Sequence, residues 1–383
     1  MTTTRDIVSI DDMKLMLADR IDSVLARYAP AAKGSHTTFG KYFTLNPGRA
    51  DRHVGSFYVN VTGAKIGQWC DHAVSNTPGE GYGDIIDLIA LSLGCSNKEA
   101  ISEARAFLGL RTETPADRRR REEALKAARK RQERAKADEK AHKQKKARQA
   151  QAIFLSGIER LRDTPVHLYL RDQRGIDFER LGRQPGAIRY VQECYYYHEC
   201  DETGEVFEGK WPAMVALIQD VQGKPIAVHR TYLALNDQGI WDKAPVPKAK
   251  KVLGLYGGGA IHVWKGIGPR GGKPGPLKDC PPDTHVMIAE GIEDCLSAVM
   301  LAPEMRVLAA ISLSNFGGVK LPANVSCVTI VADNDDGPEQ QEALKRAITA
   351  HQKEGREVRL FKNIWGGKDL NDALKGAQKA GTI

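Results

Sequence analysis

The chain has 383 residues, of which 42% are hydrophobic and 27% are charged, so it is long enough for two or three folded domains. No stretch approaches the roughly 18 uninterrupted apolar residues of a membrane span, and we expect no membrane partner. The net charge is +8, the seven cysteines are scattered, and the first residues lack the apolar core of a secretory signal, which excludes a disulfide framework and predicts a cytoplasmic protein.

Residues 1–112 are predicted to form a small α+β module. Three of its aromatic residues, Phe57, Tyr58 and Trp69, fall in two short strand patterns. They either build a small apolar core or stack on bases, as in sequence-tolerant single-strand binding. The expected elements are a helix at 10–28, strands at 55–61 and 65–70, and amphipathic helices at 83–93 and 96–108.

The net positive charge of the chain comes from residues 113–152. Between Arg118 and Arg148 there are fifteen Lys or Arg and five Asp or Glu, a net of +10. Residues 118–150 have no Gly or Pro and few large apolar side chains beyond Leu125, which predicts a solvated single helix. It is either a charged spacer or a spacer that also binds nucleic-acid phosphates through counterion release.

Residues 153–284 have a mixed α+β pattern. Hairpin turn signals occur at 201–204, 221–224 and 236–239. A stretch rich in Gly, Pro and Lys at 266–282 predicts a loop that leads into the last domain.

Residues 285–383 repeat a strand and helix pattern. Apolar runs at 285–289, 327–332 and 357–361 read as buried strands separated by helices, which predicts a parallel sheet covered on both faces. Ligands of such sheets bind beyond the carboxyl ends of the strands. An acidic cluster follows each run at that end, at 290–294, 333–337 and 367–372.

Carboxylates gathered at one edge repel one another unless a hard cation neutralises them. The set Glu290, Asp333, Asp335 and Asp369 therefore predicts a site for one or two Mg²⁺ and a phosphate ester. The alternative is that the acidic residues only cap the following helices, and we expect Glu293 and Asp336 to do only that.

The pattern of an apolar strand, Glu290-Gly291 and Asp294, followed by Asp333-x-Asp335 with Gly337, resembles the Toprim domain of bacterial-type primases, topoisomerases and some nucleases. The resemblance spans residues 285–375 and implies a Rossmann-like parallel sheet. It implies that Glu290, Asp333 and Asp335 are catalytic, with Glu290 as a general acid or base. The same residues, with Asp294 and Asp369, would bind Mg²⁺ or Mn²⁺. The stretch 367–371 is similar to a Lys-Asp-Pro-Asp motif of primases, with Asn371 where that family often has a second Asp.

Segments before residue 285 indicate which of the Toprim families the chain resembles. Residues 169–176 look like the Tyr-Leu-x-x-Arg-Gly opening of the primase core, 214–230 resemble its hairpin, and 248–259 resemble its basic segment. The chain is thus similar to bacterial and phage-type DNA primases, most closely to phage and plasmid primase-like Toprim proteins. Residues 153–284 would then be the N-terminal subdomain of the core. The nucleotide and template would be held by Arg230, Lys248, Lys250, Lys251 and Lys368.

Primases of this type begin with a zinc ribbon, and residues 55–59, 68–72 and 81–89 resemble its strands and closing helix. Structural zinc requires four thiolate or imidazole ligands. Only Cys70 and His72 lie close together in sequence, with His53 and Cys95 as distant candidates. We therefore expect a ribbon-like template-binding module without zinc.

The resemblance implies synthesis of short RNA primers on single-stranded DNA in phage, plasmid or mobile-element replication. Its partners would be the template, nucleoside triphosphates and a replicative helicase. Two rival functions stay open. One is a Toprim metal-dependent nuclease, and the other is a degenerate homologue that binds DNA or recruits a helicase without catalysis.

Overall fold

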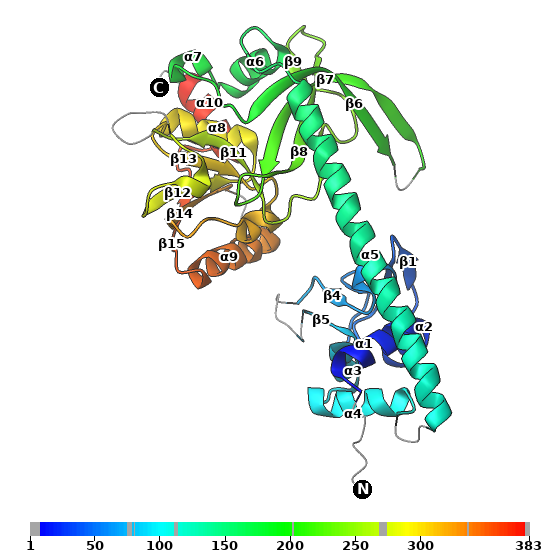
Figure 1. Ribbon diagram of the computed structural model, residues 1–383. Helices are drawn as coiled ribbons and strands as arrows, with labels where there is room; N and C mark the ends of the chain where they lie inside the picture. Colours follow the sequence, from blue (N-terminus) through cyan, green and yellow to red (C-terminus); the bar gives the residue numbers. More distant parts are fainter. Residues whose placement is uncertain are drawn as a thin grey trace. The chain divides into compact units, whose positions relative to one another are not determined.

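The computed structural model describes residues 8–74, 79, 81–110, 114–200, 203–267, 274–334 and 337–379. The chain divides into two compact units, Met1–His142 and Lys143–Ile383. The long helix α5, Pro115–Ser156, contributes residues to both units (Figure 1). Within the described ranges, none of the helices combines the length and apolar character needed to cross a membrane.

The first unit is built on a five-stranded antiparallel sheet in the order β1-β2-β3-β4-β5. The helices include α3, which begins with a capping box in which Asp84 accepts from the backbone of its first turn. The elements are α1 Ile10–Asp19, α2 Ile21–Tyr28, β1 His36–Thr38, β2 Lys41–Thr44, β3 Phe57–Asn60, η1 Gly63–Lys65, β4 Trp69–Asp71, β5 Tyr82–Gly83, α3 Ile85–Leu93 and α4 Asn97–Phe107.

The inner face of this sheet is the core of the first unit. Phe57 is fully buried and Trp69 is 2% exposed, and their rings lie 5.6 Å apart. They pack with apolar residues of the helices, so the prediction of a core role is correct for these two aromatic residues. Asp71 is also buried, and it accepts hydrogen bonds from Asn46 and from the Ala73 backbone.

The outer face carries a row of aromatic side chains. Because alternate residues of a strand point to opposite faces, Tyr58 lies on the face opposite Phe57. The strand register places His36 beside Phe43 and Phe43 beside Tyr58, with ring centroids 5.1 Å and 5.4 Å apart. The Lys41 ammonium lies 4.1 Å from the Tyr58 ring centroid. The sequence identified only Tyr58 of this row.

Helix α5 is confirmed, but the expectation that it is solvated throughout is wrong. Leu125 and Ala128 are buried, and Arg129 pairs with Asp12 of α1 at 2.6 Å. Further along, Ala150 and Phe154 are buried in an apolar cluster of the second unit. A few small and large apolar side chains, Phe154 among them, thus give this highly charged helix a narrow apolar contact, and ion pairs such as Arg129 with Asp12 supplement it.

The second unit is built on one ten-stranded sheet in the order β10-β8-β7-β11-β13-β12-β14-β15, with β6 paired to β7 and β9 to β8. Its antiparallel strands are β6 Ile188–Glu199, β7 Val206–Gln219, β8 Pro225–Leu235, β9 Trp241–Lys243, β10 Lys250–Gly254 and β11 Ala260–Lys265. Its parallel strands are β12 Thr284–Ala289, β13 Arg306–Ala309, β14 Val325–Ala332 and β15 Glu357–Lys362. Its helices are α6 Pro165–Leu168, the π-helical turn η2 Tyr169–Gln173, α7 Phe178–Leu181, η4 Leu277–Asp279, α8 Ile292–Leu301, η5 Leu313–Gly318, α9 Pro338–Lys353 and α10 Leu370–Lys379.

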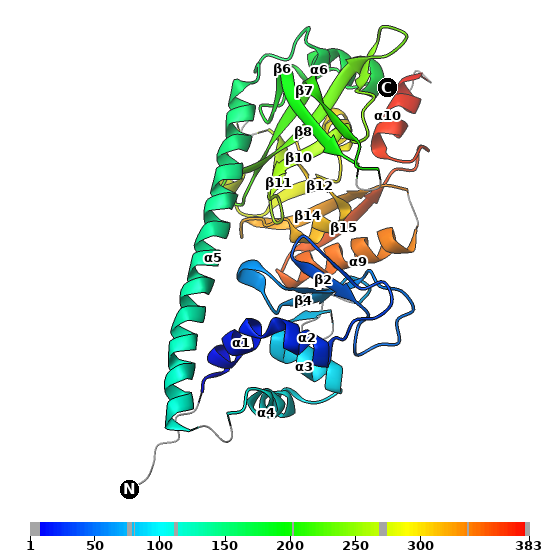
Figure 2. The ribbon, with the colours of Figure 1, turned by 90° about the vertical axis from the view of Figure 1, so that its right-hand side faces the viewer.

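Of the parallel strands, β14 is covered on both faces, as predicted, whereas the expectation of a buried strand at 357–361 is wrong, because β15 lies at the edge of the sheet and Leu360 is 47% exposed. On β14, Ile330 belongs to the apolar cluster that contains Ala347 of α9, and Val331 to the cluster that contains Leu296 of α8 and Leu374 of α10. The figures show α9 on one side of β14 and β15 and α10 on the other (Figures 1 and 2). The mixed α/β fold is thus confirmed. The sequence pattern did not predict β13, Arg306–Ala309. This strand has only four residues, and three of them are apolar.

Candidate active site

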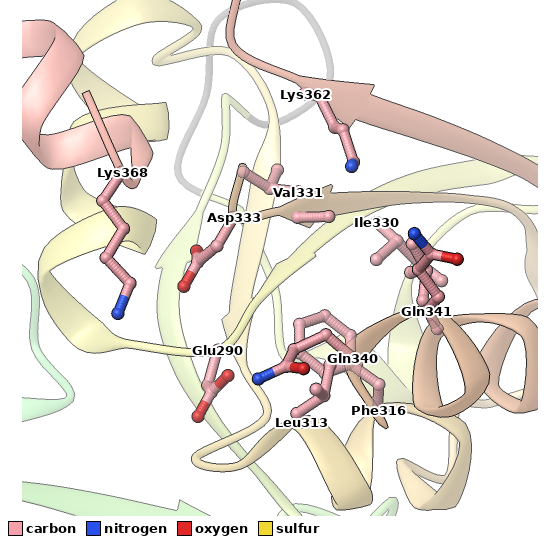
Figure 3. A pocket seen from close by; sticks show the side chains of 12 residues that line it. Glu290, Leu313, Phe316, Ile330, Val331, Asp333, Gln340, Gln341, Lys362 and Lys368 are labelled. Carbon is pink, nitrogen blue, oxygen red and sulfur yellow. The ribbon is translucent and has the colours of Figure 1, made fainter. Parts of the chain in front are cut away.

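The acidic site lies where two neighbouring parallel strands end. Glu290 follows β12 and Asp333 follows β14, and the pairing of Ile288 with Ile330 brings the two strand ends to the same level. Both carboxylates line a cleft of about 370 Å³ together with Lys362 and Lys368 (Figure 3). Two further predicted residues, Asp335 and Asp336, lie outside the described residues.

Two carboxyl groups of this site, Glu290 and Asp294, have raised pKa values. Burial raises the pKa of Glu290, and the Asp333 carboxylate raises it further, while Lys250 and Lys368 partly oppose both effects. Burial, followed by the charges of Asp369 and Asp333, raises the pKa of Asp294 to about 7. A negative charge is therefore costly here, which is the condition that a bound cation relieves.

Asp294 reaches the cluster because α8 begins immediately after Gly291. A Cβ atom on Gly291 would lie 2.9 Å from Oδ2 of Asp294, so the glycine leaves room for that carboxylate. The other oxygen, Oδ1, accepts from the Asn371 backbone N–H at 3.2 Å. This contact links the first turn of α8 to the first turn of α10.

The donor set suits a hard divalent cation, since all the predicted ligands are carboxylates. Among the described residues, no group of three or more His, Cys, Asp or Glu side chains is placed to hold one metal ion. Mg²⁺ does not need such a cage, because it is usually bound by one or two carboxylates, waters and substrate phosphates. Glu290 and Asp333 fit that mode of binding.

Asp369 and Asn371 take different positions in the third cluster. Asp369 caps α10, since its Oδ1 accepts from the Asp372 backbone N–H at 2.7 Å. Asn371 is 2% exposed, and its Nδ2 donates to the Arg174 carbonyl at 2.8 Å and to Ser297 Oγ at 2.9 Å. The Nδ2 of Asn371 thus joins α10 to α8 and to the residue that follows η2.

Glu293 does more than cap a helix, so the expectation for it is wrong. Its side chain is buried, accepts from the Tyr169 hydroxyl at 3.0 Å and pairs with the Lys250 ammonium at 2.9 Å. Burial raises the pKa of Glu293, but the charge and hydrogen bond of Lys250, together with a backbone hydrogen bond and the Lys243 charge, outweigh burial and bring the pKa to about 2. Arg174 Nε in turn donates to the Tyr169 hydroxyl at 2.9 Å.

The predicted basic residues divide into two groups. Lys250 and Lys251 are consecutive in β10, so their side chains leave opposite faces of the sheet. Lys250 reaches Glu293, whereas Lys251 lies opposite Arg230 of β8 and donates to the Tyr197 carbonyl. Burial lowers the pKa of Lys251, and the Arg230 and Lys248 charges lower it further. Arg230, Lys248 and Lys251 thus form a basic cluster on the face away from the carboxylates, while Lys368 lines the cleft.

Three residues near Glu293 were not assigned roles from the sequence. Tyr169 and Arg174 belong to the quoted primase-like motif, so a signal existed. Lys243 of β9 is half-buried, and burial and the nearby Lys250 charge lower its pKa. We find no sequence signal for Lys243.

Two family models match the chain. Residues 144–263 match a domain of unknown function, DUF7146. Residues 285–380 match the Toprim domain. This part of the chain is a Toprim domain. The expected Toprim domain is confirmed, and β12 to α10 with the acidic edge fall within it.

Comparison with curated proteins finds no match. Among solved structures, the zinc-binding and RNA polymerase domains of the Aquifex aeolicus primase are similar at 16% identity and a TM-score of 0.33, covering 96% of this chain and 83% of that one. The DnaG primase catalytic domain bound to single-stranded DNA is similar at 15% and 0.39, covering 63% and 77%. A DNA primase domain from Pseudomonas aeruginosa is similar at 15% and 0.37, covering 61% and 77%.

The Lys250–Glu293 pair should support the stability of the Toprim domain. We expect Lys250→Met to lower the free energy of unfolding by about 1–3 kcal/mol, because it leaves a buried carboxylate without its cation while Lys250 itself is partly exposed. Urea unfolding followed by circular dichroism measures the change. The control is Lys320→Met, which breaks an exposed pair with Glu354. Equal losses in the two variants would contradict the role of Lys250.

Removing a carboxylate from the Toprim site should raise the free energy of unfolding, because it relieves repulsion between like charges. Asp294→Asn keeps the acceptor for the Asn371 N–H but removes one buried charge, so in EDTA the variant should be about 1 kcal/mol more stable than the parent. Mg²⁺ should stabilise the parent and have a smaller effect on the variant. Urea unfolding in EDTA and in Mg²⁺ tests both expectations, with the exposed Glu357→Gln as control. A variant that is less stable in EDTA and responds to Mg²⁺ like the parent would contradict the repulsion.

Proposed function

We propose that this chain is a primase that synthesises short RNA primers on single-stranded DNA, using Mg²⁺ or Mn²⁺, in phage, plasmid or mobile-element replication. The observation that carries the proposal is the pairing of Glu290 and Asp333 at one edge of a Toprim domain with Lys368 in the same cleft. Carboxylates for a cation and an ammonium for phosphate are what nucleotidyl transfer requires.

The proposed chemistry is attack of a 3′-hydroxyl on the α-phosphate of a nucleoside triphosphate. The divalent ion, when bound, supplies charge neutralisation of the reacting phosphates and a lower pKa for the hydroxyl. Glu290 and Asp333 would hold it, with Asp335, Asp294 and Asp369 as further candidate ligands. The raised pKa of Glu290 suits it to accept the hydroxyl proton. Lys368 and Lys250 would then oppose the charge that develops on the pyrophosphate.

The region before the Toprim domain favours a primase over other Toprim enzymes. Its primase-like motifs at 169–176, 214–230 and 248–259 occur in the expected order. Its strands continue into the Toprim sheet, since β11 pairs with both β7 and β13. The basic cluster of Arg230, Lys248 and Lys251 would bind the template backbone, as the N-terminal subdomain of a primase core at 153–284 would require.

The first unit supports binding of a single-stranded template. The outer-face row of His36, Phe43 and Tyr58 offers ring surfaces for bases, and Lys41 adds a positive charge. Residues 1–112 would be the template-binding module and 113–152 a basic linker to the core. Cys70 Sγ lies 3.9 Å from His72 Nδ1, and these two are the only candidate zinc ligands that are close in sequence. We propose that this module works without zinc, because structural zinc requires four ligands.

We also propose that the chain acts in the cytoplasm with a replicative helicase.

Glu290→Gln should abolish primer synthesis. The purified chain is incubated with single-stranded DNA, Mg²⁺ or Mn²⁺ and labelled nucleoside triphosphates, and products are separated on a denaturing gel. We expect short products from the parent and a decrease of at least about 100-fold in the variant, because the substitution removes a general base and metal ligand. Glu357→Gln, at the start of β15, is the matched control.

The same assay separates the rival functions. A shortened template in place of extension products would indicate a nuclease. DNA binding with neither product would indicate a non-catalytic homologue. If Glu290→Gln made product as fast as the parent, the carboxylates would not carry the chemistry.

The basic helix should contribute to DNA binding. Neutralising residues 118–121 should weaken the affinity for single-stranded DNA and reduce the slope of log K against log salt by about 0.7 for each phosphate that the helix no longer neutralises. Fluorescence anisotropy at several salt concentrations measures both quantities. Arg129→Gln is the comparison, because Arg129 already pairs with Asp12. Unchanged affinity at low salt would mean that the helix is only a spacer.

A further inference from the structure

The loop between β15 and α10 exposes two large apolar side chains beside the acidic cleft. Ile364 is 88% exposed and Trp365 is 59% exposed. The loop joins Lys362 to Lys368, and both of these lysines line the cleft that contains Glu290 (Figure 3). An exposed tryptophan leaves more apolar surface in water than almost any other side chain, so its position indicates a binding surface.

Hydrogen bonds hold both ends of this loop. The Asn334 side chain donates to the carbonyls of Asn363 at 3.3 Å and Gly367 at 3.1 Å, and its backbone N–H donates to the Lys368 carbonyl at 2.8 Å. Asn363 Nδ2 donates to the Asp369 carbonyl at 3.2 Å. Asn334 directly follows the predicted metal ligand Asp333, so the loop is fixed to the acidic site itself.

The turn that presents Trp365 depends on glycine. Gly366 and Gly367 have φ values of 90° and 84°, in the left-handed region that side chains disfavour. A Cβ on Gly367 would also lie 2.6 Å from Cβ of Asp372. The Trp365 ring is placed 6.2 Å from the Phe361 ring, at an angle of 47°. The indole of Trp365 therefore contacts Phe361 on one side, and much of the rest of its surface is exposed to solvent.

We propose that Ile364 and Trp365 form a stacking platform for a nucleobase whose phosphates lie over Lys362 and Lys368. The inference rests on the proposed function, because it assumes that the acidic cleft acts on nucleotides. An indole stacks on any base, and the ammonium groups of the two lysines that line the cleft would bind phosphates without reading sequence. The base belongs either to the single strand or to the nucleoside triphosphate, since both present the same ring and phosphate chemistry.

The test compares Trp365→Leu, which keeps an apolar side chain without a ring, with Trp365→Phe, which keeps a ring. Anisotropy of labelled oligothymidylate and fluorescence of a labelled ATP analogue measure the two dissociation constants in the full chain. We expect Trp365→Leu to weaken one of them by about 5- to 100-fold, the effect of removing one base–aromatic stack, and Trp365→Phe to restore most of it. The ligand that is affected identifies the source of the base. Leu301→Ala, which changes an exposed apolar residue at the end of α8, is the control.

Unchanged binding of both ligands by Trp365→Leu would overturn the platform. So would a change of oligomeric state, by sedimentation, with binding unchanged, because the patch would then be a surface between copies of the chain. The outcome is separable from that of the primase assay. If Trp365→Leu binds more weakly but the parent makes no primer, the platform stands and the proposed function fails. If Trp365→Leu binds normally and the parent makes primers, the proposed function stands and the platform fails.

Discussion

The acidic site depends on the contacts of the buried Glu293 carboxylate with Lys250 and Tyr169. These contacts join the Toprim domain to the region that precedes it in the second unit. A carboxylate without water requires strong partners, and here they come from far away in the sequence, from Lys250 of β10 and Tyr169 of η2. Because Glu293 precedes Asp294 in α8, fixing Glu293 also fixes the carboxylate that reaches the cluster. The antiparallel region thereby sets the orientation of a Toprim helix and supplies cations around it.

Two opposite electrostatic conditions thus occur within one helical turn. Glu293 is stabilised as an anion by adjacent cations, whereas Asp294 is buried among other carboxylates, and their pKa values are displaced to about 2 and about 7. The first condition stabilises the fold. The second is unfavourable for the protein alone and favourable for a cation, as is common at sites that carry function.

The sequence predicted β12 and β14 well because each is rich in buried apolar residues and is followed by acidic residues, whereas β15, which carries Glu357 and Arg359, is an exposed edge strand. It did not reveal β13, whose run is short, or the burial of Glu293, because partners from residues 169 and 250 are invisible to a local pattern. It placed Lys250 and Lys251 in one basic set, although strand alternation sends them to opposite faces. It also offered no reason to expect Asn371 to face Ser297, since that contact depends on how α10 packs on α8.

The sheet of the second unit passes without interruption from the antiparallel strands into the Toprim domain, through β11 between β7 and β13. A fragment that began at residue 285 would include every predicted carboxylate, but β13 would become an open edge with unpaired backbone groups. It would also uncover apolar side chains of α8 that pack with Trp264 and Val263 in the same cluster. The Toprim domain of this chain therefore shares its sheet and part of its apolar core with the antiparallel strands that precede it.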